Sequence, residues 1–236
     1  MGSPVLAEAA IALVAGVPGW LTDDQARALH AAASAVPSGG RVVEIGSHHG
    51  RSTIVLAHAA RSVGARVTAV DPFPADWRYG AAGTEAAFRA GTARAGVADV
   101  VDLQVTTSAE ARASWDGPVH LLYVDGKHDY WSLRDDLRWS RHVPEGGTVL
   151  VHDAFSSLGV TLGLLRELLP SRRLTYAGRT GSLARLRVAP PTPADRAQVL
   201  GPLPWFARNL VVKVLLRLRL RALARLLGHR GTDDPY

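Results

Sequence analysis

Short apolar runs alternate with longer stretches of helical character from residue 41 onward. The apolar runs are rich in β-branched residues and have the length of strands. They lie at residues 41–45, 66–70, 101–105, 119–124, 148–151, 174–176 and 183–188. Helices are expected between them at 51–63, 84–96, 108–114, 131–142 and 157–169. This repetition, with continuously apolar strands, predicts an α/β fold in which helices cover both faces of a parallel sheet.

The first and last parts of this pattern differ from the middle. Residues 1–40 are rich in alanine and leucine and predict an N-terminal helical segment of two short helices. Thr22 and Gln25 have the spacing of a capping box at the start of the second helix. The last two strands are separated only by residues 177–182, which contain two glycines. That spacing predicts an antiparallel hairpin.

Composition limits the classes of protein that this chain can be. The 236 residues are 47% hydrophobic and 20% charged, which suits one α/β domain with a short appendage and excludes a disordered or collagen-like chain. The absence of cysteine excludes disulfides, thiolate zinc sites and a cysteine nucleophile. No basic leader precedes the first apolar stretch, and no uncharged apolar run reaches the roughly 20 residues of a membrane-spanning helix. We therefore expect a cytoplasmic protein.

Positive charge is concentrated near the C-terminus. The net charge is +6, and residues 208–230 hold seven arginines and lysines and no acid. Residues 189–204 contain five prolines and are interpreted as a linker, whereas 205–236 predict a basic amphipathic helix and tail. Its apolar stripe consists of Leu210, Val211, Val214, Leu215, Leu218 and Leu226. We expect this stripe to pack on the body or in a homodimer, with an anionic membrane as the alternative and no nucleic-acid partner.

A glycine turn joins the first predicted strand to the next helix. The strand carries Glu44, the turn runs from Gly46 to Gly50, and Ser52 and Thr53 open the helix. Ligands of parallel sheets bind beyond the carboxyl ends of the strands, and a helix N-terminus favours carboxylate or phosphate groups. The spacing Gly-x-x-x-Gly differs from the Gly-x-Gly-x-x-Gly of pyrophosphate-binding turns. The turn therefore predicts a ligand site without fixing its ligand.

Acidic and histidine side chains follow three of the predicted strands. Asp71 ends the second strand, about 20 residues after the glycine turn, where an acid can bind ribose hydroxyls. Asp125 and His128 follow the strand at 119–124, and His152 and Asp153 follow the strand at 148–151. Two carboxylates converging from neighbouring strand ends predict a site for a hard divalent cation. Turn-forming or helix-capping roles are the alternative for each aspartate.

Together, these motifs resemble those of the class I S-adenosylmethionine-dependent methyltransferases, from about residue 40 to 188. Within that superfamily they are similar to the metal-dependent O-methyltransferases, which include the catechol enzymes and, closer in motif, actinobacterial sugar O-methyltransferases. The resemblance implies a Rossmann-like sheet of seven strands, the last antiparallel. It also makes residues 41–188 the S-adenosylmethionine-binding catalytic domain.

The same resemblance implies a role for each group of residues. The cofactor would contact Glu44, Gly46, Ser47, Gly50, Ser52, Thr53, Asp71, Thr107, Ser108 and Asp125. Asp125 and Asp153 would bind the metal, and His128 would be the general base. The chain has Ala154 where the catechol enzymes have asparagine, and His152 where the sugar enzymes have an acid. The third ligand is thus His152 or water, with Mg²⁺ expected and Mn²⁺ favoured if the imidazole binds.

Aromatic and arginine side chains are the predicted wall of the acceptor site. They are Trp77, Arg78, Tyr79, Tyr130 and Trp131, which suit sugars and phenols alike, and packing is the alternative for each. The acids that follow His128, namely Asp129, Asp135 and Asp136, are interpreted as first-turn and solvent-face residues of a helix. His48 and His49, in the glycine turn, are given no catalytic role.

From these residues we expect an O-methyltransferase that acts on a hydroxyl of a sugar or glycoside. Mannosides of a methylated polysaccharide and glycosylated natural products are the acceptors considered. A divalent cation would lower the pKa of the acceptor hydroxyl, and a histidine would take its proton. The alternatives are a phenol or catechol O-methyltransferase, an NAD-dependent oxidoreductase and a non-catalytic cofactor-binding module. The missing second glycine of the dinucleotide fingerprint counts against the oxidoreductase.

Overall fold

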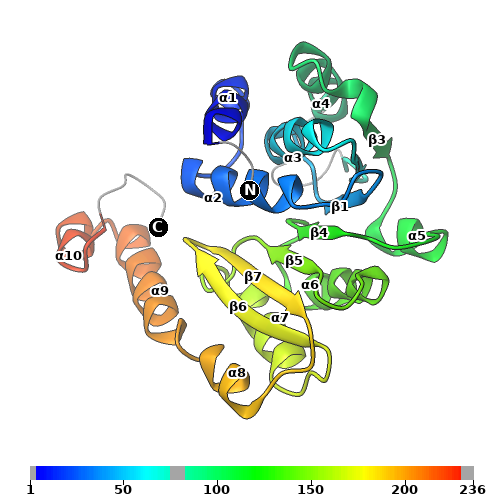
Figure 1. Cartoon of the computed structure of the whole chain (residues 1–236). Coiled ribbons are helices and arrows are strands. Elements are labelled where there is room, and N and C mark those ends of the chain that lie inside the picture. Colours follow the sequence, from blue (N-terminus) through cyan, green and yellow to red (C-terminus); the bar gives the residue numbers. More distant parts are fainter. Residues whose placement is uncertain (1–3, 75–82, 230–236) are drawn as a thin grey trace.

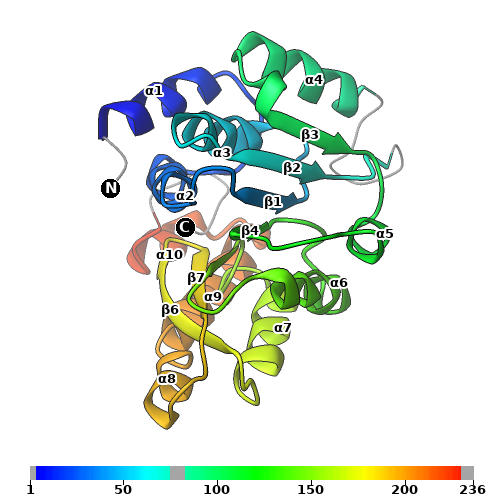
Figure 2. The ribbon, with the colours of Figure 1, turned by 45° about the vertical axis from the view of Figure 1, so that its right-hand side comes forward.

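A seven-stranded sheet forms the centre of the molecule, seen from two sides in Figures 1 and 2. The computed structural model describes residues 4–74 and 83–229. The strands lie in the order β3-β2-β1-β4-β5-β7-β6. They are β1 (Arg41–Ile45), β2 (Arg66–Val70), β3 (Val101–Gln104), β4 (Leu121–Val124), β5 (Thr148–Val151), β6 (Leu174–Thr180) and β7 (Leu183–Val188). The first five are parallel and β7 is antiparallel to both of its neighbours, which confirms the predicted Rossmann-like sheet.

Helices cover both faces of the sheet (Figure 1). One layer contains α1 (Pro4–Val14), α2 (Asp23–Ser34), α3 (Arg51–Ser62) and α4 (Thr84–Arg94). The other contains α5 (Ser108–Ala113), α6 (Tyr130–Asp136), the 3₁₀ helix Leu137–His142 and α7 (Leu158–Leu168). A further 3₁₀ turn, Ala98–Val100, precedes β3. The predicted capping box is present, because Thr22 and Gln25 exchange hydrogen bonds at the start of α2.

Alternate residues of each central strand enter two different cores. Val43 and Leu122 pack in the core beneath α6 and α7, whereas Val42 and Leu121 pack in the core beneath α2 and α3. Such two-sided burial is why the strands are apolar throughout and why side chains able to bind a ligand are left to the strand ends. The carboxyl ends of β1, β2, β4 and β5 meet at one edge of the sheet, so the residues that follow them can share a site.

The C-terminal part differs from its prediction at two points. The interpretation of 189–204 as a linker is incomplete, because α8 (Pro193–Gln198) begins there with a capping box between Thr192 and Asp195. The single helix predicted near 205–227 is divided into α9 (Leu203–Arg217) and α10 (Arg221–Leu226). Arg219 lies between them with a left-handed φ of 61°, a conformation that ends an α-helix.

The inner face of α9 is not the predicted apolar stripe. Its buried residues are Asn209 and Val212, while Val211, Val214 and Leu218 of the stripe are exposed. The stripe therefore does not pack on the body as a whole, and its packing in a homodimer stays a prediction. Although no membrane-spanning run was expected, Pro193–Arg217 is a helical stretch long and apolar enough to cross a membrane by length and composition. A turn divides this stretch between α8 and α9, and the cytoplasmic location stays a prediction.

Candidate active site

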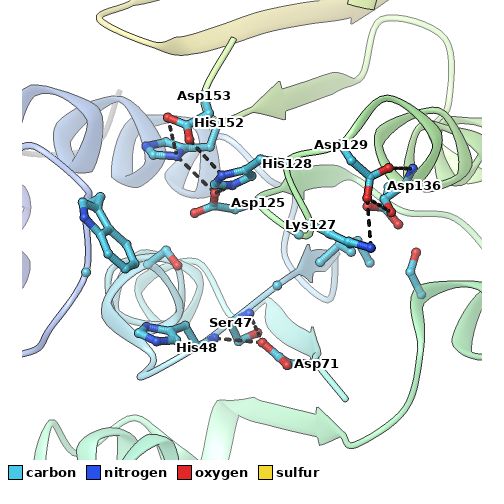
Figure 3. A pocket seen from close by; sticks show the side chains of 18 of the residues that line it. Ser47, His48, Asp71, Asp125, Lys127, His128, Asp129, Asp136, His152 and Asp153 are labelled. Atoms are coloured by element: carbon cyan, nitrogen blue, oxygen red, sulfur yellow. Dashed lines mark hydrogen bonds and ion pairs between the residues drawn. The ribbon is translucent and has the colours of Figure 1, made fainter. Parts of the chain in front are cut away.

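The glycine turn after β1 is held by the carboxylate of Asp71 (Figure 3). One oxygen of Asp71 accepts hydrogen bonds from the backbone N–H groups of Ser47 (2.8 Å) and His48 (2.9 Å), and the other accepts one from Phe73 (2.7 Å). Gly46 has a φ of +84°, and a Cβ there would lie 2.3 Å from the backbone oxygen of Asp125. Only glycine therefore lets the ends of β1 and β4 approach this closely.

Glu44 lies beneath the turn, and its side chain has no exposed surface. Its Oε2 accepts hydrogen bonds from the hydroxyls of Ser47 (3.0 Å) and Thr53, which join the strand to both the turn and the helix. The other oxygen, Oε1, is buried without a hydrogen-bond partner among the described residues. Burial raises the pKa of Glu44 to about 7, although the neighbouring hydroxyls oppose the rise. Glu44 thus supports the turn from below.

Two aspartates and two histidines meet beyond the ends of β4 and β5 (Figure 3). Nε2 of His128 lies 3.2 Å from Oδ1 of Asp125, and Nδ1 of the same ring lies 2.9 Å from Oδ2 of Asp153. Nδ1 of His152 lies 3.1 Å from Oδ1 of Asp125 and 3.7 Å from Oδ1 of Asp153. The buried Tyr123 donates its hydroxyl hydrogen to Asp125 from below (2.8 Å). The convergence expected from the two strand ends is therefore present.

The charges of this cluster change the acidity of each member. Burial acts to raise the pKa of Asp125, but His152 and His128 outweigh it and hold that pKa well below its usual range. The pKa of Asp153 is likewise lowered, to about 2, since the two histidines outweigh its burial. Burial opposes protonation of His128, yet the two carboxylates raise its pKa to about 10. The pKa of His152 is raised as well, against its burial and mainly by Asp125. The positive charge of His128 thus balances negative charge of the two carboxylates that it contacts.

His152 is oriented by a residue from the N-terminal helical segment. The Nε2 of this ring, which is only 4% exposed, lies 3.3 Å from Oε1 of Gln25, and the Gln25 amide donates to the hydroxyl of Ser182 (2.9 Å). An amide oxygen can only accept, so this contact places a hydrogen on Nε2. Nδ1 then faces Asp125 and makes no hydrogen bond within the described part of the chain. Such a nitrogen, buried beside a carboxylate, has the chemistry of a metal ligand.

The backbone around this edge is strained at four residues other than glycine. His48, Phe73, Asp153 and Phe155 have φ values of 46°, 44°, 54° and 59°. Non-glycine residues in the left-handed region cost free energy and gather at ligand sites, where the surrounding structure enforces them. Two of these residues lie beside the glycine turn and two follow β5, so both halves of the site contain strained backbone.

A single cavity of about 1380 Å³ connects these features. It is larger than the roughly 300–1,000 Å³ of a usual small-molecule site, so it has room for a cofactor and an acceptor together. Of the predicted site residues, it brings together Gly46, Ser47, Ser52, Asp71, Thr107, Ser108, Asp125, His128, His152 and Asp153. His48 and His49 also line it.

Other predicted residues lie outside this cavity. Glu44, Gly50 and Thr53 are not part of its wall, and two of them act through the hydrogen bonds beneath the turn. Tyr130 and Trp131 are also not lining residues; they pack edge to face on α6, and Trp131 is 72% exposed. The structure therefore does not place this pair at the predicted acceptor wall. Residues 77–79, which complete that predicted wall, lie outside the described residues.

Sequence reasoning missed several lining residues. Asp136, interpreted as a solvent-face acid, is only 6% exposed and lines the cavity near Ser108, so that interpretation is wrong. Burial raises the pKa of Asp136 to about 6. Its spacing of three residues from the buried Leu133 was the available sign that it faces inward. Trp20, from the turn between α1 and α2, and Arg217, from α9, line the cavity without any comparable sign in the sequence.

The donor set fits a divalent cation. One ligand atom each from Asp125, His128 and His152 lies within 4.8 Å of the others, and Asp153 borders the same space. Two carboxylates and a buried imidazole nitrogen suit Mn²⁺ or a similar ion as well as Mg²⁺. The carboxylates of Asp125 and Asp153 contact His128. A cation bound between them would therefore replace the imidazolium as the positive charge that balances them.

Comparisons with known proteins agree with this geometry. Residues 43–154 match the family model of a methyltransferase domain. Cofactor-bound Rv0187 from MTB is 24% identical, over 81% of this chain and 93% of its own, with a TM-score of 0.56. A second similar structure is the O-methyltransferase TomG from Streptomyces achromogenes, which is involved in tomaymycin synthesis and is in complex with S-adenosylmethionine. It is 19% identical, over 80% of this chain and 91% of its own, with a TM-score of 0.56.

A third relative is the O-methyltransferase from Bacillus cereus in complex with S-adenosylhomocysteine. It is 17% identical, over 80% of this chain and 92% of its own, with a TM-score of 0.57. At such identities the likeness establishes the fold, and the family model adds a match over residues 43–154. The chain therefore has the fold of S-adenosylmethionine-dependent O-methyltransferases, and its residues 43–154 match a methyltransferase domain.

Proposed function

We propose that the protein transfers the methyl group of S-adenosylmethionine to a hydroxyl of a sugar or glycoside, with the help of a divalent cation. One observation carries the proposal. The cluster of Asp125, His128, His152 and Asp153 shares a cavity with the glycine turn that Asp71 holds. Metal-assisted methyl transfer to oxygen needs a cofactor site and a metal site within the same cavity.

The glycine-turn half of the cavity would hold the cofactor. Gly46 and Ser47 lie where the methionine part is expected, and Asp71 lies at the end of β2, where an acid can accept hydrogen bonds from ribose. Ser108 and Asp136 would border the adenine. S-adenosylmethionine would supply the methyl group from its positively charged sulfur, and that sulfur would keep the electron pair of the broken S–C bond.

The cluster half would prepare the acceptor oxygen. Asp125, Asp153 and Nδ1 of His152 would hold the cation, whose charge lowers the pKa of a bound hydroxyl. A new C–O bond forms as the S–C bond breaks, and the hydroxyl proton must leave. With its pKa raised to about 10 by the carboxylates, His128 already carries a proton at neutral pH. Asp125 and Asp153 would hold the cation, and with their charge balanced in this way His128 could accept the proton of the acceptor hydroxyl.

An aromatic acceptor is the second candidate, because the cavity wall is partly aromatic. Trp20 and Phe73 line the cavity together with Leu216. Aromatic faces suit the flat ring of a phenol or catechol as well as the apolar face of a sugar. Lys127 and Arg217, which line the same cavity, offer the additional hydrogen-bond donors that a polyhydroxylated acceptor uses. We therefore favour the sugar or glycoside.

Methyl transfer from radiolabelled S-adenosylmethionine to a panel of sugars, glycosides and catechols tests the proposal. We expect turnover on glycosides that is abolished by excess EDTA and restored by Mg²⁺ or Mn²⁺. Full turnover in a metal-free preparation would contradict the role of the cluster, and turnover confined to catechols would establish the second candidate. Thermal stabilisation by S-adenosylhomocysteine but not by NAD checks the cofactor separately.

A further inference from the structure

Helix α9 has two faces with different surroundings (Figure 1). The inner face is bound to the body. Asn209 Nδ2 donates to the backbone oxygen of Phe155 (3.3 Å), and Lys213 Nζ donates to that of Ser156 (2.7 Å). One turn further on, Leu216 lines the catalytic cavity. The helix therefore begins beside the edge of the sheet and ends at the active site.

The opposite face of α9 is apolar and exposed. Val211, Val214 and Leu218 follow one another at three- and four-residue steps and are all exposed, so they form one stripe along the helix. Helix α10 continues this pattern, with Leu223 exposed by 47% and Leu226 by 82%. Exposed large apolar residues that succeed one another on adjoining helices mark an interaction surface rather than an ordinary solvent face.

The charge around this surface indicates what binds it. Arg217, Arg219 and Arg225 are exposed beside the apolar residues, and the sequence has no aspartate or glutamate from 196 to 232. A twofold dimer over this face would bring the same patch of each copy together, and arginines would then oppose arginines. An anionic lipid surface instead attracts every one of these cations and accepts the apolar side chains among its acyl chains.

We infer that α9 and α10 lie on an anionic phospholipid membrane and present the active site to an acceptor carried by a lipid. The apolar residues enter the interface, and the arginines contact the lipid phosphates. Because Leu216 and Arg217 line the catalytic cavity at the end of α9, a polar group attached to a membrane lipid lies close to the cluster of Asp125 and His128. The acceptor part of this inference rests on the proposed function, whereas the membrane part does not.

Co-sedimentation with vesicles tests the membrane part. We expect the full chain to bind phosphatidylcholine vesicles that contain phosphatidylglycerol, and not vesicles of phosphatidylcholine alone. The variant Arg219→Gln/Arg225→Gln should bind these vesicles roughly 10- to 25-fold more weakly, because each lost cation weakens binding by about fivefold. The variant Leu223→Ser/Leu226→Ser should lose binding at least as strongly. Failure of the unaltered chain to bind anionic vesicles would overturn the inference.

The matched control carries the same substitutions on another exposed helix face. Leu158 and Leu162 of α7 are 54% and 47% exposed, so Leu158→Ser/Leu162→Ser should leave vesicle binding unchanged. Equal losses in both serine variants would overturn the assignment to α10. Light scattering adds a second outcome: a dimer that Leu223→Ser/Leu226→Ser converts to a monomer would assign the face to a second copy and overturn the inference. Stabilisation by S-adenosylhomocysteine in every variant shows that the cofactor site is intact, so failure of the proposed function is detected separately.

Discussion

Replacement of Glu44 by glutamine should make the stability of the protein less dependent on pH. The carboxyl group is fully buried and its pKa is raised from 4.5 to about 7, mainly by burial. Between these two values the folded state holds a proton that the unfolded state has released. The stabilising contribution of Glu44 is therefore fully present below its pKa in the unfolded state and is lost as the pH rises through its pKa in the folded state. Glutamine cannot titrate, so its contribution does not change with pH.

The magnitude follows from the size of the shift. Each pKa unit corresponds to about 1.4 kcal/mol, so complete ionisation of Glu44 lowers the free energy of unfolding by roughly 3.4 kcal/mol. Between about pH 5 and about pH 8.5 the loss is roughly 2.5 kcal/mol, because part of it has occurred at the lower pH. His128 and His152, whose pKa values are also raised, contribute less to the stability of both proteins as the pH rises. The difference between wild type and Glu44→Gln isolates the carboxyl group.

Urea unfolding at a series of pH values measures this difference. We expect the free energy of unfolding to fall by about 2.5 kcal/mol less in Glu44→Gln than in wild type over this range, whatever constant offset the buried amide adds. Glu145→Gln, at an exposed glutamate, is the matched control and should follow wild type. Parallel curves for wild type and Glu44→Gln would refute the reasoning, since Glu44 would then be ionised throughout.

Three further substitutions test the cofactor and catalytic assignments. Asp71→Ala should weaken binding of S-adenosylhomocysteine by more than about tenfold in calorimetry, because it removes three backbone hydrogen bonds and the proposed ribose contact. Unchanged affinity would contradict this assignment. His128→Ala should lower kcat by roughly 10²–10⁴ and retain cofactor affinity, and near-normal turnover at pH 7 would make His152 the base. Asp136→Asn should weaken S-adenosylhomocysteine binding roughly three- to tenfold if Asp136 borders the adenine, and an effect on the acceptor KM alone would place it elsewhere in the cavity.

Much of the fold was predictable because its strands are buried on both faces. Continuous apolar runs ended at Ile45, Val70, Val124 and Val151, and the structure ends the strands at these residues. The shared edge of a parallel sheet then explains why the acids that follow them converge. The end of α9 was not predictable in this way. Arg219 adopts a left-handed conformation without the glycine or proline that would have marked it in the sequence.

Some residues of the candidate site could not be predicted because they reach it from distant segments of the chain. Gln25 was recognised only as a capping residue, yet its amide also orients His152, which lies 127 positions away in the chain. Trp20 reaches the cavity for a similar reason, because the turn between α1 and α2 lies over the end of β1 and its ring stacks near His48, at 5.8 Å between centroids. Periodicity reports which face of an element is buried, but it carries no information about which other segment covers that face.

Under the proposed function, the position of His128 would connect metal binding with catalysis. In the described structure its ring lies between Asp125 and Asp153, where it neutralises the carboxylates that would otherwise repel one another. A cation bound by the same carboxylates would remove the reason for the raised pKa of His128 and release its proton. The residue would then become a base only in the metal-loaded enzyme, when an acceptor hydroxyl can be activated. The departure from an acid to His152 in this cluster fits the same logic, since a neutral imidazole ligand leaves more positive charge on the cation to act on the acceptor oxygen.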